Sequence, residues 1–354
     1  MKIKTKILLA LVLTMIATAA AASEQELEKR LVQSEGWVAY QVPMTSEAGT
    51  PCCFAWRGDD PVRTGCDLDG REWNIGNKNR HGSGEGSLSD SNRADQLKDD
   101  QLKVYVRVNH ARIEKIRAFG ASCTINSATP VRIVDAVDSG DSIALLAHIA
   151  SESAREPREH FDEALAALAM HAHASATSTL AQLADATHPR KLREQALFWL
   201  GQMRGADGAH IVEHVAISDG DADLRAHAVF CLSQSHGTDA YVAIGKIATS
   251  DPSDHVREQS LFWMAQMGDE RAKTDITTAI ENDPSSHVRE QAVFALSQLK
   301  GEQADAALIA LVRGGYPREI KKQALFWLGQ SGSDAAMKFL DATLAKTTSS
   351  VAGK

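Results

Sequence analysis

The sequence lacks several features that would assign it to a broad class of proteins. Beyond Ala22, no apolar run approaches the roughly 18 residues that a transmembrane helix needs. Aromatic residues make up only 5% of the 354 residues, and 24 glycines and 9 prolines are too few for a low-complexity or collagen-like chain. The formal charge is −8, which argues against a sequence-independent nucleic-acid binder, because such proteins need a basic face.

Common catalytic and metal-binding motifs are also missing. The chain contains no Gly-rich phosphate loop, no Gly-x-Ser-x-Gly sequence and no Walker pattern. It has no Cys-x-x-Cys, and the spacing of its cysteines matches no common zinc site. We therefore expect no cofactor. The negative charge also disfavours electrostatic docking on an anionic membrane.

The N-terminal segment, 1–22, has the pattern of an export signal. Lys2, Lys4 and Lys6 precede an apolar run from Ile7 to Ala17, and an Ala-x-Ala sequence fits cleavage after Ala22. The apolar run is too short for a comfortable membrane span. We therefore predict a signal peptide at 1–22 and a periplasmic or secreted mature protein without stable membrane insertion.

Cysteine usage agrees with export to an oxidising compartment. Four of the five cysteines lie in the first third of the mature chain, at Cys52, Cys53, Cys66 and Cys123. An even number in an exported domain predicts two disulfides. Adjacent cysteines rarely bond to each other, so one of Cys52 and Cys53 should pair with Cys66 and the other with Cys123. The sequence leaves that choice open, and it predicts Cys231 as a core residue.

Residues 23–138 are predicted to form a small β-rich domain that these disulfides stabilise. About 115 residues would be marginally stable without them. A Gly- and Ser-rich loop is expected at 76–92, and a turn at Asn109-His110. The chain should begin with a helix at 24–32 and continue with strands at 37–42, 53–56, 66–68, 102–108, 113–119 and 131–134.

The strongest signal is an internal repeat within residues 139–346. The segment LREQALFWLGQ at 192–202 returns as VREQSLFWMAQ at 256–266 and as IKKQALFWLGQ at 320–330. The five copies start at positions 192, 224, 256, 288 and 320, so the period is constant, and each copy is followed by a second amphipathic run. Two helices in every repeat of this length predict an α-solenoid. Residues 347–354 are expected to be a flexible tail.

The repeated pattern apolar-Arg-x-x-Ala-x-x-x-Leu-small resembles HEAT repeats of the phycobilisome-lyase-like type, within the armadillo-like class. The whole layout resembles exported bacterial HEAT-repeat proteins. The resemblance implies a scaffold or adaptor that binds a protein or peptide partner in the cell envelope. Some relatives with this solenoid are enzymes, which leaves a lyase or an oxidoreductase as an alternative. The His-Glu dipeptides that hold iron in deoxyhypusine hydroxylase are absent here.

The first helix of each repeat carries the candidate binding residues. On a helical wheel, Leu192, Ala196, Trp199 and Leu200 form the core stripe, and the Phe and Gln positions share one flank. The family usually has a polar residue at the Phe position. Either each Phe packs on the next repeat and each Gln bridges backbones, or part of the series is exposed and grips an extended or helical peptide. The series are Phe198, Phe230, Phe262, Phe294 and Phe326, and Gln202, Gln234, Gln266, Gln298 and Gln330.

A third series is basic. It comprises Arg193, Arg225, Arg257 and Arg289, with Lys321 at the fifth position. Acidic residues cluster at the turns between repeats, for example Asp219, Asp251 and Asp283. We expect ion pairs between repeats, with phosphate binding as the alternative that the overall acidity disfavours.

One short string suggests an enzymatic alternative. His210, Glu213 and His214 form an H-x-x-E-H sequence that places both histidines on one helix face, as in an inverted zincin site. Such a site needs a further ligand from elsewhere in the fold. The alternative function is therefore a metal-dependent hydrolase.

Overall fold

The structure is a computed structural model that describes residues 25–49, 51–57, 60–70, 99–155, 161–235, 239–300 and 303–351. The chain divides into two compact units, Met1–Arg204 and Gly205–Lys354. The predicted signal peptide and the loop expected at 76–92 lie outside the described residues. The predicted boundary between residues 138 and 139 stays a prediction.

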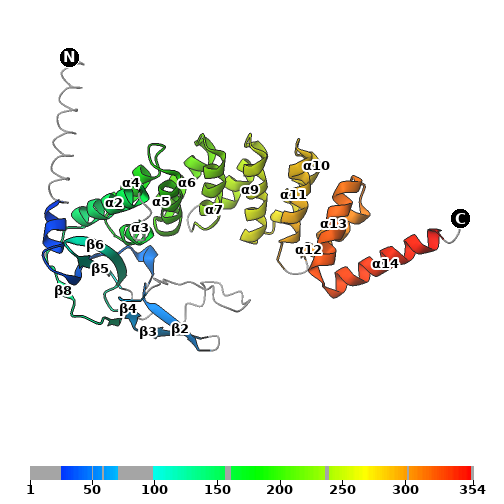
Figure 1. The fold of residues 1–354 in the computed structure, drawn as a ribbon. Helices are drawn as coiled ribbons and strands as arrows, with labels where there is room; N and C mark the ends of the chain where they lie inside the picture. The colour runs from blue at the N-terminus through cyan, green and yellow to red at the C-terminus, as the bar shows by residue number, and fades with distance from the viewer. Residues whose placement is uncertain are drawn as a thin grey trace, which may run out of the picture. The chain divides into compact units, whose positions relative to one another are not determined.

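The first unit contains a four-stranded sheet with strand order β6-β5-β1-β8 (Figure 1). The β1–β5 and β5–β6 pairs are antiparallel, whereas β8 runs parallel to β1. Two smaller pairs, β2–β3 and β4–β7, complete the strands. The strands are β1 (Gly36–Pro43), β2 (Cys53–Arg57), β3 (Asp60–Thr64), β4 (Cys66–Asp67), β5 (Gln101–Asn109), β6 (Arg112–Gly120), β7 (Ile125–Asn126) and β8 (Arg132–Ile133).

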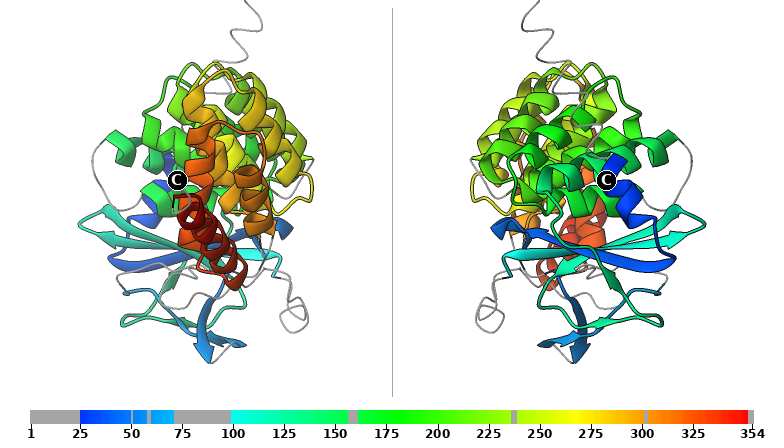
Figure 2. Two further views of the ribbon diagram at one scale, coloured as in Figure 1. Left: turned by 90° about the vertical axis from the view of Figure 1, so that its right-hand side faces the viewer. Right: turned by 90° about the vertical axis from the view of Figure 1, so that its left-hand side faces the viewer.

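β5 and β6 form a long hairpin, drawn in cyan in Figure 2. Its turn lies one residue later than the sequence predicted. His110 and Ala111 both have left-handed backbones, with φ angles of 50° and 56°. Two consecutive residues with positive φ match the right-handed twist of the flanking strands. Asn109 remains in the ladder opposite Arg112, and its side-chain amide donates a 2.6 Å hydrogen bond to Glu114. These contacts hold Asn109 in the strand.

The two faces of the sheet are covered by different parts of the chain. On one face, Trp37, Tyr105 and Phe119 form a buried cluster with Cys66 and Leu68. On the other side, the Tyr40 hydroxyl lies 2.8 Å from Ser142 of the first described solenoid helix. Apolar residues must therefore occupy both faces of these strands, which explains their almost continuous burial.

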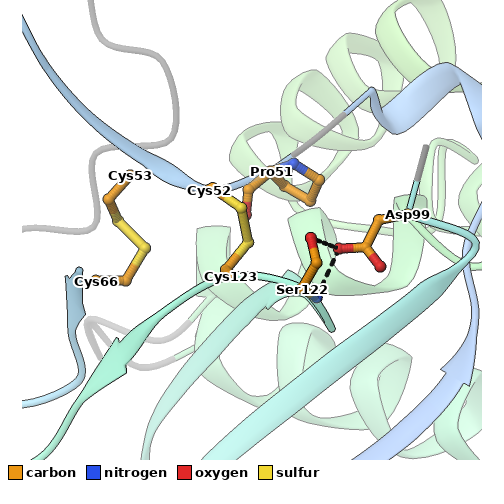
Figure 3. The surroundings of a disulfide bond; sticks show 7 residues. All are labelled: Pro51, Cys52, Cys53, Cys66, Asp99, Ser122 and Cys123. Atoms are coloured by element: carbon orange, nitrogen blue, oxygen red, sulfur yellow. Dashed lines mark hydrogen bonds between the residues drawn. A yellow bond between two sulfur atoms is a disulfide. The ribbon is translucent and has the colours of Figure 1, made fainter. Parts of the chain in front are cut away.

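The disulfides connect Cys52 to Cys123 and Cys53 to Cys66, which settles the pairing that the sequence left open (Figure 3). Cys53 and Cys123 pack against the Trp37 cluster. Beside them, Asp99 accepts hydrogen bonds from the backbone N–H and the hydroxyl of Ser122, at 2.8 Å and 2.7 Å. The disulfides thus connect the small strands to the edge of the main sheet.

The helices of the first unit follow the sheet directly and pack against it. The buried Arg117 of β6 forms an ion pair with Glu163, and the Glu163 carboxylate also accepts the Ile116 N–H at 3.2 Å. Beyond the end of β1, Met44 forms an isolated antiparallel β-bridge with His171, in the segment after α3. The helices are α2 (Ser139–Arg155), α3 (Phe161–Ala169), α4 (Ser175–Leu183) and α5 (Arg190–Met203), with a short 3-10 turn, η1 (Ser46–Ala48).

The second unit is an α-solenoid of stacked helix pairs, as the constant period of the sequence predicts (Figure 1). Asp221, Asp239 and Ser285 cap helix N-termini by accepting backbone N–H groups. Gly268 and Gly332 end two helices with φ angles of 71° and 64°. The helices are α6 (Gly205–Ser218), α7 (Ala222–Ser233), α8 (Ala240–Ser250), α9 (Asp254–Met267), α10 (Ala272–Asn282), α11 (Ser286–Ser297), α12 (Gln303–Arg313), α13 (Arg318–Ser331) and α14 (Asp334–Val351).

The predicted core stripe is correct except at one residue. Leu192, Ala196 and Leu200 of α5 are fully buried, but Trp199 is only half-buried. Leu197 is fully buried instead, and the Trp199 indole packs beside the Phe198 ring. Cys231, at the Trp position of α7, is buried as predicted and belongs to neither disulfide.

Candidate binding surface

The phenylalanines of the second unit lie on α7, α9, α11 and α13, the first helices of their repeats. The helices pack side by side in that order, α7 against α9, α9 against α11 and α11 against α13. The Phe262 and Phe294 rings are stacked, with centroids 5.9 Å apart and an interplanar angle of 12°. Each phenylalanine thus contacts a neighbouring aromatic ring, and together they form a continuous aromatic row: Phe230, Trp263, Phe262, Phe294, Trp327 and Phe326.

Tryptophans complete the row at every second repeat. Trp263 lies between Phe230 and Phe262, with ring centroids at 4.9 Å and 5.0 Å. Trp327 lies in the same way between Phe294 and Phe326, at 4.8 Å and 5.0 Å. The intervening repeats have small residues at this position, Cys231 and Ala295. The tryptophan of one repeat therefore extends the aromatic contact to the repeat before it.

The aromatic row is packed and accessible at once. Phe230, Phe262 and Phe294 are half-buried, and Phe326 is 53% exposed. In the first unit, Phe198 and Trp199 form a similar pair, with ring centroids 5.1 Å apart. The indole N–H of Trp199 is buried and has no hydrogen-bond partner among the described residues. The rings are thus packed against neighbouring repeats and also partly exposed, and binding of a peptide by this series stays a prediction.

The glutamines flank the row without bridging neighbouring backbones in the two cases where their hydrogen bonds are defined. Gln234 and Gln298 each donate 3.1 Å hydrogen bonds to the serine that precedes them, Ser233 and Ser297. Gln266 and Gln298 are half-buried, whereas Gln234 and Gln330 are exposed. Gln202 of α5 is half-buried. A role of these amides in binding stays a prediction.

The arginines of the basic series point into the solenoid and connect successive repeats. Arg225 forms a bidentate ion pair with Asp251, at 2.8 Å and 2.9 Å, and Arg257 does the same with Asp283, at 2.8 Å and 3.0 Å. All four side chains are nearly fully buried. The predicted ion pairs are thus present in these repeats, and these two guanidinium groups are not exposed for phosphate binding.

The backbone joins these ion pairs into a chain. Arg225 donates to the Asp219 carbonyl, Arg257 to the Asp251 carbonyl and Arg289 to the Asp283 carbonyl. Burial alone would raise the pKa of Asp251, but hydrogen bonds from Arg225 and the Ser253 N–H hold that pKa below its ordinary value. Asp251 therefore remains ionised and neutralises the charge of Arg225 inside the solenoid.

Two carboxylates lie one helical turn before phenylalanines of the aromatic row. Glu258 precedes Phe262 and Glu290 precedes Phe294 by four residues, which places each pair on one helix face. One carboxylate oxygen of Glu258 is buried without a hydrogen bond among the described residues, and His287 Nε2 lies 3.3 Å from it. Burial raises the pKa of Glu258. The surface thus combines aromatic rings with partly desolvated negative charge.

The H-x-x-E-H string lies on the outside of α6. The His210 side chain is 63% exposed, and its Nδ1 is 3.9 Å from a Glu213 carboxylate oxygen. His214 is also exposed and lies 3.3 Å from the Ser218 hydroxyl. Across the described part of the chain, no three His, Cys, Asp or Glu side chains come together as metal ligands would. The hydrolase alternative stays a prediction.

Two general findings bear on where the protein works. The pair of disulfides indicates an oxidising environment outside the cytoplasm. Within the residues that the structure describes, every helix is too short or too polar to cross a membrane.

Comparison with known proteins identifies the repeats. A family model of HEAT repeats matches residues 242–329, which hold most of the aromatic row. No curated protein matches the sequence. The match therefore rests on the helical repeats of the second unit.

Several solved structures are similar at low identity. YibA of Escherichia coli is 20% identical over 45% of this chain and 60% of its own, with a TM-score of 0.32. Human deoxyhypusine hydroxylase, solved with glycerol, is 17% identical over 53% of this chain and 72% of its own, with a TM-score of 0.29. The CpcE–CpcF complex of phycocyanin lyase from Nostoc sp. is 15% identical over 61% of this chain and 97% of its own, with a TM-score of 0.28.

Proposed function

This chain is a HEAT-repeat protein, and from that premise we propose that it is an exported scaffold that binds another protein along the aromatic row. The observation that carries the proposal is the row itself, six aromatic rings in continuous contact that remain partly exposed. A monomeric protein rarely exposes contiguous apolar surface without a binding role. Aromatic side chains also contribute most of the energy at many interfaces.

The surrounding polar residues fit this role. Glutamine amides can both donate and accept, so they can pair with the N–H and C=O groups of a bound polypeptide. The arginine–aspartate pairs stiffen the connection between repeats and hold the row in one geometry. A rigid surface loses less conformational entropy on binding. The disulfides of the first unit support action in an oxidising environment outside the cytoplasm. We propose that this is the cell envelope and that residues 1–22 are removed as a signal peptide.

Capture of the partner from the native envelope tests the proposal. Phe326 is 53% exposed, so Phe326→Ser should leave the thermal unfolding curve almost unchanged while reducing the yield of a crosslinked partner severalfold. Ile217→Ser is the matched control, because Ile217 is 59% exposed on α6, a second helix. Equal yields from both variants and from the unaltered protein would contradict a role for the aromatic row.

A further inference from the structure

The arginines are removed from the surface of the first helices, whereas carboxylates remain beside the aromatic row. Arg225 and Arg257 are neutralised by buried aspartates, and Arg289 donates to the Asp283 carbonyl. Glu258 and Glu290 lie one turn before the stacked rings Phe262 and Phe294. Residues 205–354 as a whole carry 20 acidic and 14 basic residues. The middle of the row is therefore an aromatic surface with two carboxylates beside it, and the Glu258 carboxylate also lies 3.3 Å from His287 Nε2.

We propose that the partner presents an extended, cationic segment whose lysines or arginines contact the aromatic rings and carboxylates of α9 and α11. This inference rests on the proposed function and adds the chemistry of the partner. A cation gains both from the face of an aromatic ring and from a nearby carboxylate. The buried Glu258 oxygen lies 3.3 Å from His287 Nε2 but has no hydrogen bond among the described residues. The broad rotation of a carboxyl group lets a bound cation supply one.

The spacing of the repeats selects the conformation of the bound segment. Packed neighbouring helices lie about 8–10 Å apart, so equivalent residues of α9 and α11 recur at about that distance. A polyproline II helix has three residues per turn and rises about 3.1 Å per residue, so every third side chain returns to the same face after about 9 Å. Basic residues three positions apart therefore match the spacing of the two carboxylates, Glu258 and Glu290.

The series of carboxylates formed by Glu258 and Glu290 does not continue into α13. Lys322 stands at the position of Glu258 and Glu290, and its side chain is 75% exposed. This lysine opposes a further cationic residue at that repeat. Changing its charge should therefore extend the site by one repeat, which gives a substitution expected to strengthen binding.

Synthetic peptides test the proposal directly. The probe is the fluorescently labelled peptide (Lys-Pro-Pro)4, in which each lysine precedes a proline and so favours an extended backbone. Binding to the mature protein is followed by fluorescence anisotropy at physiological salt. We expect the Glu258→Gln/Glu290→Gln variant to bind roughly tenfold more weakly and Lys322→Glu to bind about twofold to fivefold more tightly.

Three controls separate this site from general electrostatic attraction. Lys-Lys-Lys-Lys followed by eight prolines has the same composition without the spacing, and it should bind more weakly than the probe. (Glu-Pro-Pro)4 should not bind. Glu213→Gln/Glu270→Gln removes two carboxylates outside the first helices and should leave binding of the probe unchanged.

Binding that ignores lysine spacing, or that falls equally in both glutamine variants, would overturn the proposal. Absence of probe binding to the unaltered protein would also overturn it. The proposed function fails separately, through equal capture of a natural partner by the unaltered protein and by Phe326→Ser. A partner that is lost with Phe326→Ser while (Lys-Pro-Pro)4 fails to bind would mean that the row binds a segment of different chemistry.

Discussion

At the scale of single residues, the polar group that makes folding most sensitive to pH is buried in the first unit. The Ser142 hydroxyl lies 2.8 Å from the Tyr40 hydroxyl and 2.9 Å from His171 Nε2, and His171 Nδ1 lies 2.8 Å from the Ala167 carbonyl. All three side chains are fully buried. Burial lowers the pKa of His171 to about 4, and the nearby charge of Arg204 acts in the same direction. The histidine is therefore neutral in the folded protein.

This histidine makes the first unit sensitive to acid. Its folded pKa lies below its ordinary value of 6.5, so its stabilising contribution is complete above pH 6.5 and declines as the pH falls toward 4. Between pH 8 and pH 4.5 the free energy of unfolding should fall by about 2 to 3 kcal/mol from this group. Hydrogen exchange of the β1 and β5 amides, followed as a function of pH, measures this change in the free energy of unfolding.

His171→Gln removes the titrating group, so the part of the pH dependence that it causes should disappear. His210→Gln, at an exposed position of α6, should retain the full dependence. The same loss on acidification in all three proteins would show that His171 is not the responsible group.

At the scale of helices, the arginine–aspartate pairs determine how one repeat holds the next. Arg257 contacts Asp283 with two hydrogen bonds, donates to the Asp251 carbonyl and also reaches Asp254. Removing one partner of a buried pair leaves an unpaired charge, so Arg257→Ala should lower the free energy of unfolding by about 3 to 5 kcal/mol. Urea unfolding followed by circular dichroism measures this change.

Two further substitutions make the result specific. Arg257→Lys keeps the charge but loses the planar two-point contact, so it should fall between the alanine variant and the unaltered protein. Arg271 is 46% exposed in its ion pair with Asp269, so Arg271→Ala should lower the free energy of unfolding much less than Arg257→Ala does. If Arg257→Ala cost no more than Arg271→Ala, the buried pairs would not couple the repeats.

The repeats were predictable because each copy has the same pattern of residue types and forms the same pair of helices. The apolar positions, the turn aspartates and the arginines recur at the same interval. Arg225 and Arg257 each pair with an aspartate one repeat further along the chain. The aromatic row was only half predictable. The sequence shows Phe and Trp side by side, but contact between Phe230 and Trp263 depends on the packing of two helices.

The first unit was less predictable because its contacts span long distances in the chain. Tyr40 and Ser142 are separated by 102 residues, and no local pattern links them. The disulfide pairing depends on how the small strands pack on the sheet, so adjacent cysteines looked equivalent in the sequence. The turn after β5 moved by one residue because Asn109 finds a partner across the hairpin.

At the scale of the whole molecule, the protein combines a disulfide-bonded unit with a solenoid whose first helices carry the aromatic row. The central claim is that a partner protein lies along this row. Site-specific photo-crosslinking tests it most directly, with a photoreactive phenylalanine analogue placed at Phe326 or, as a control, at Lys273 on the second helix α10. We predict that a partner in the native envelope crosslinks from position 326 and not from position 273. Crosslinking of the same partner from position 273 alone would contradict the account.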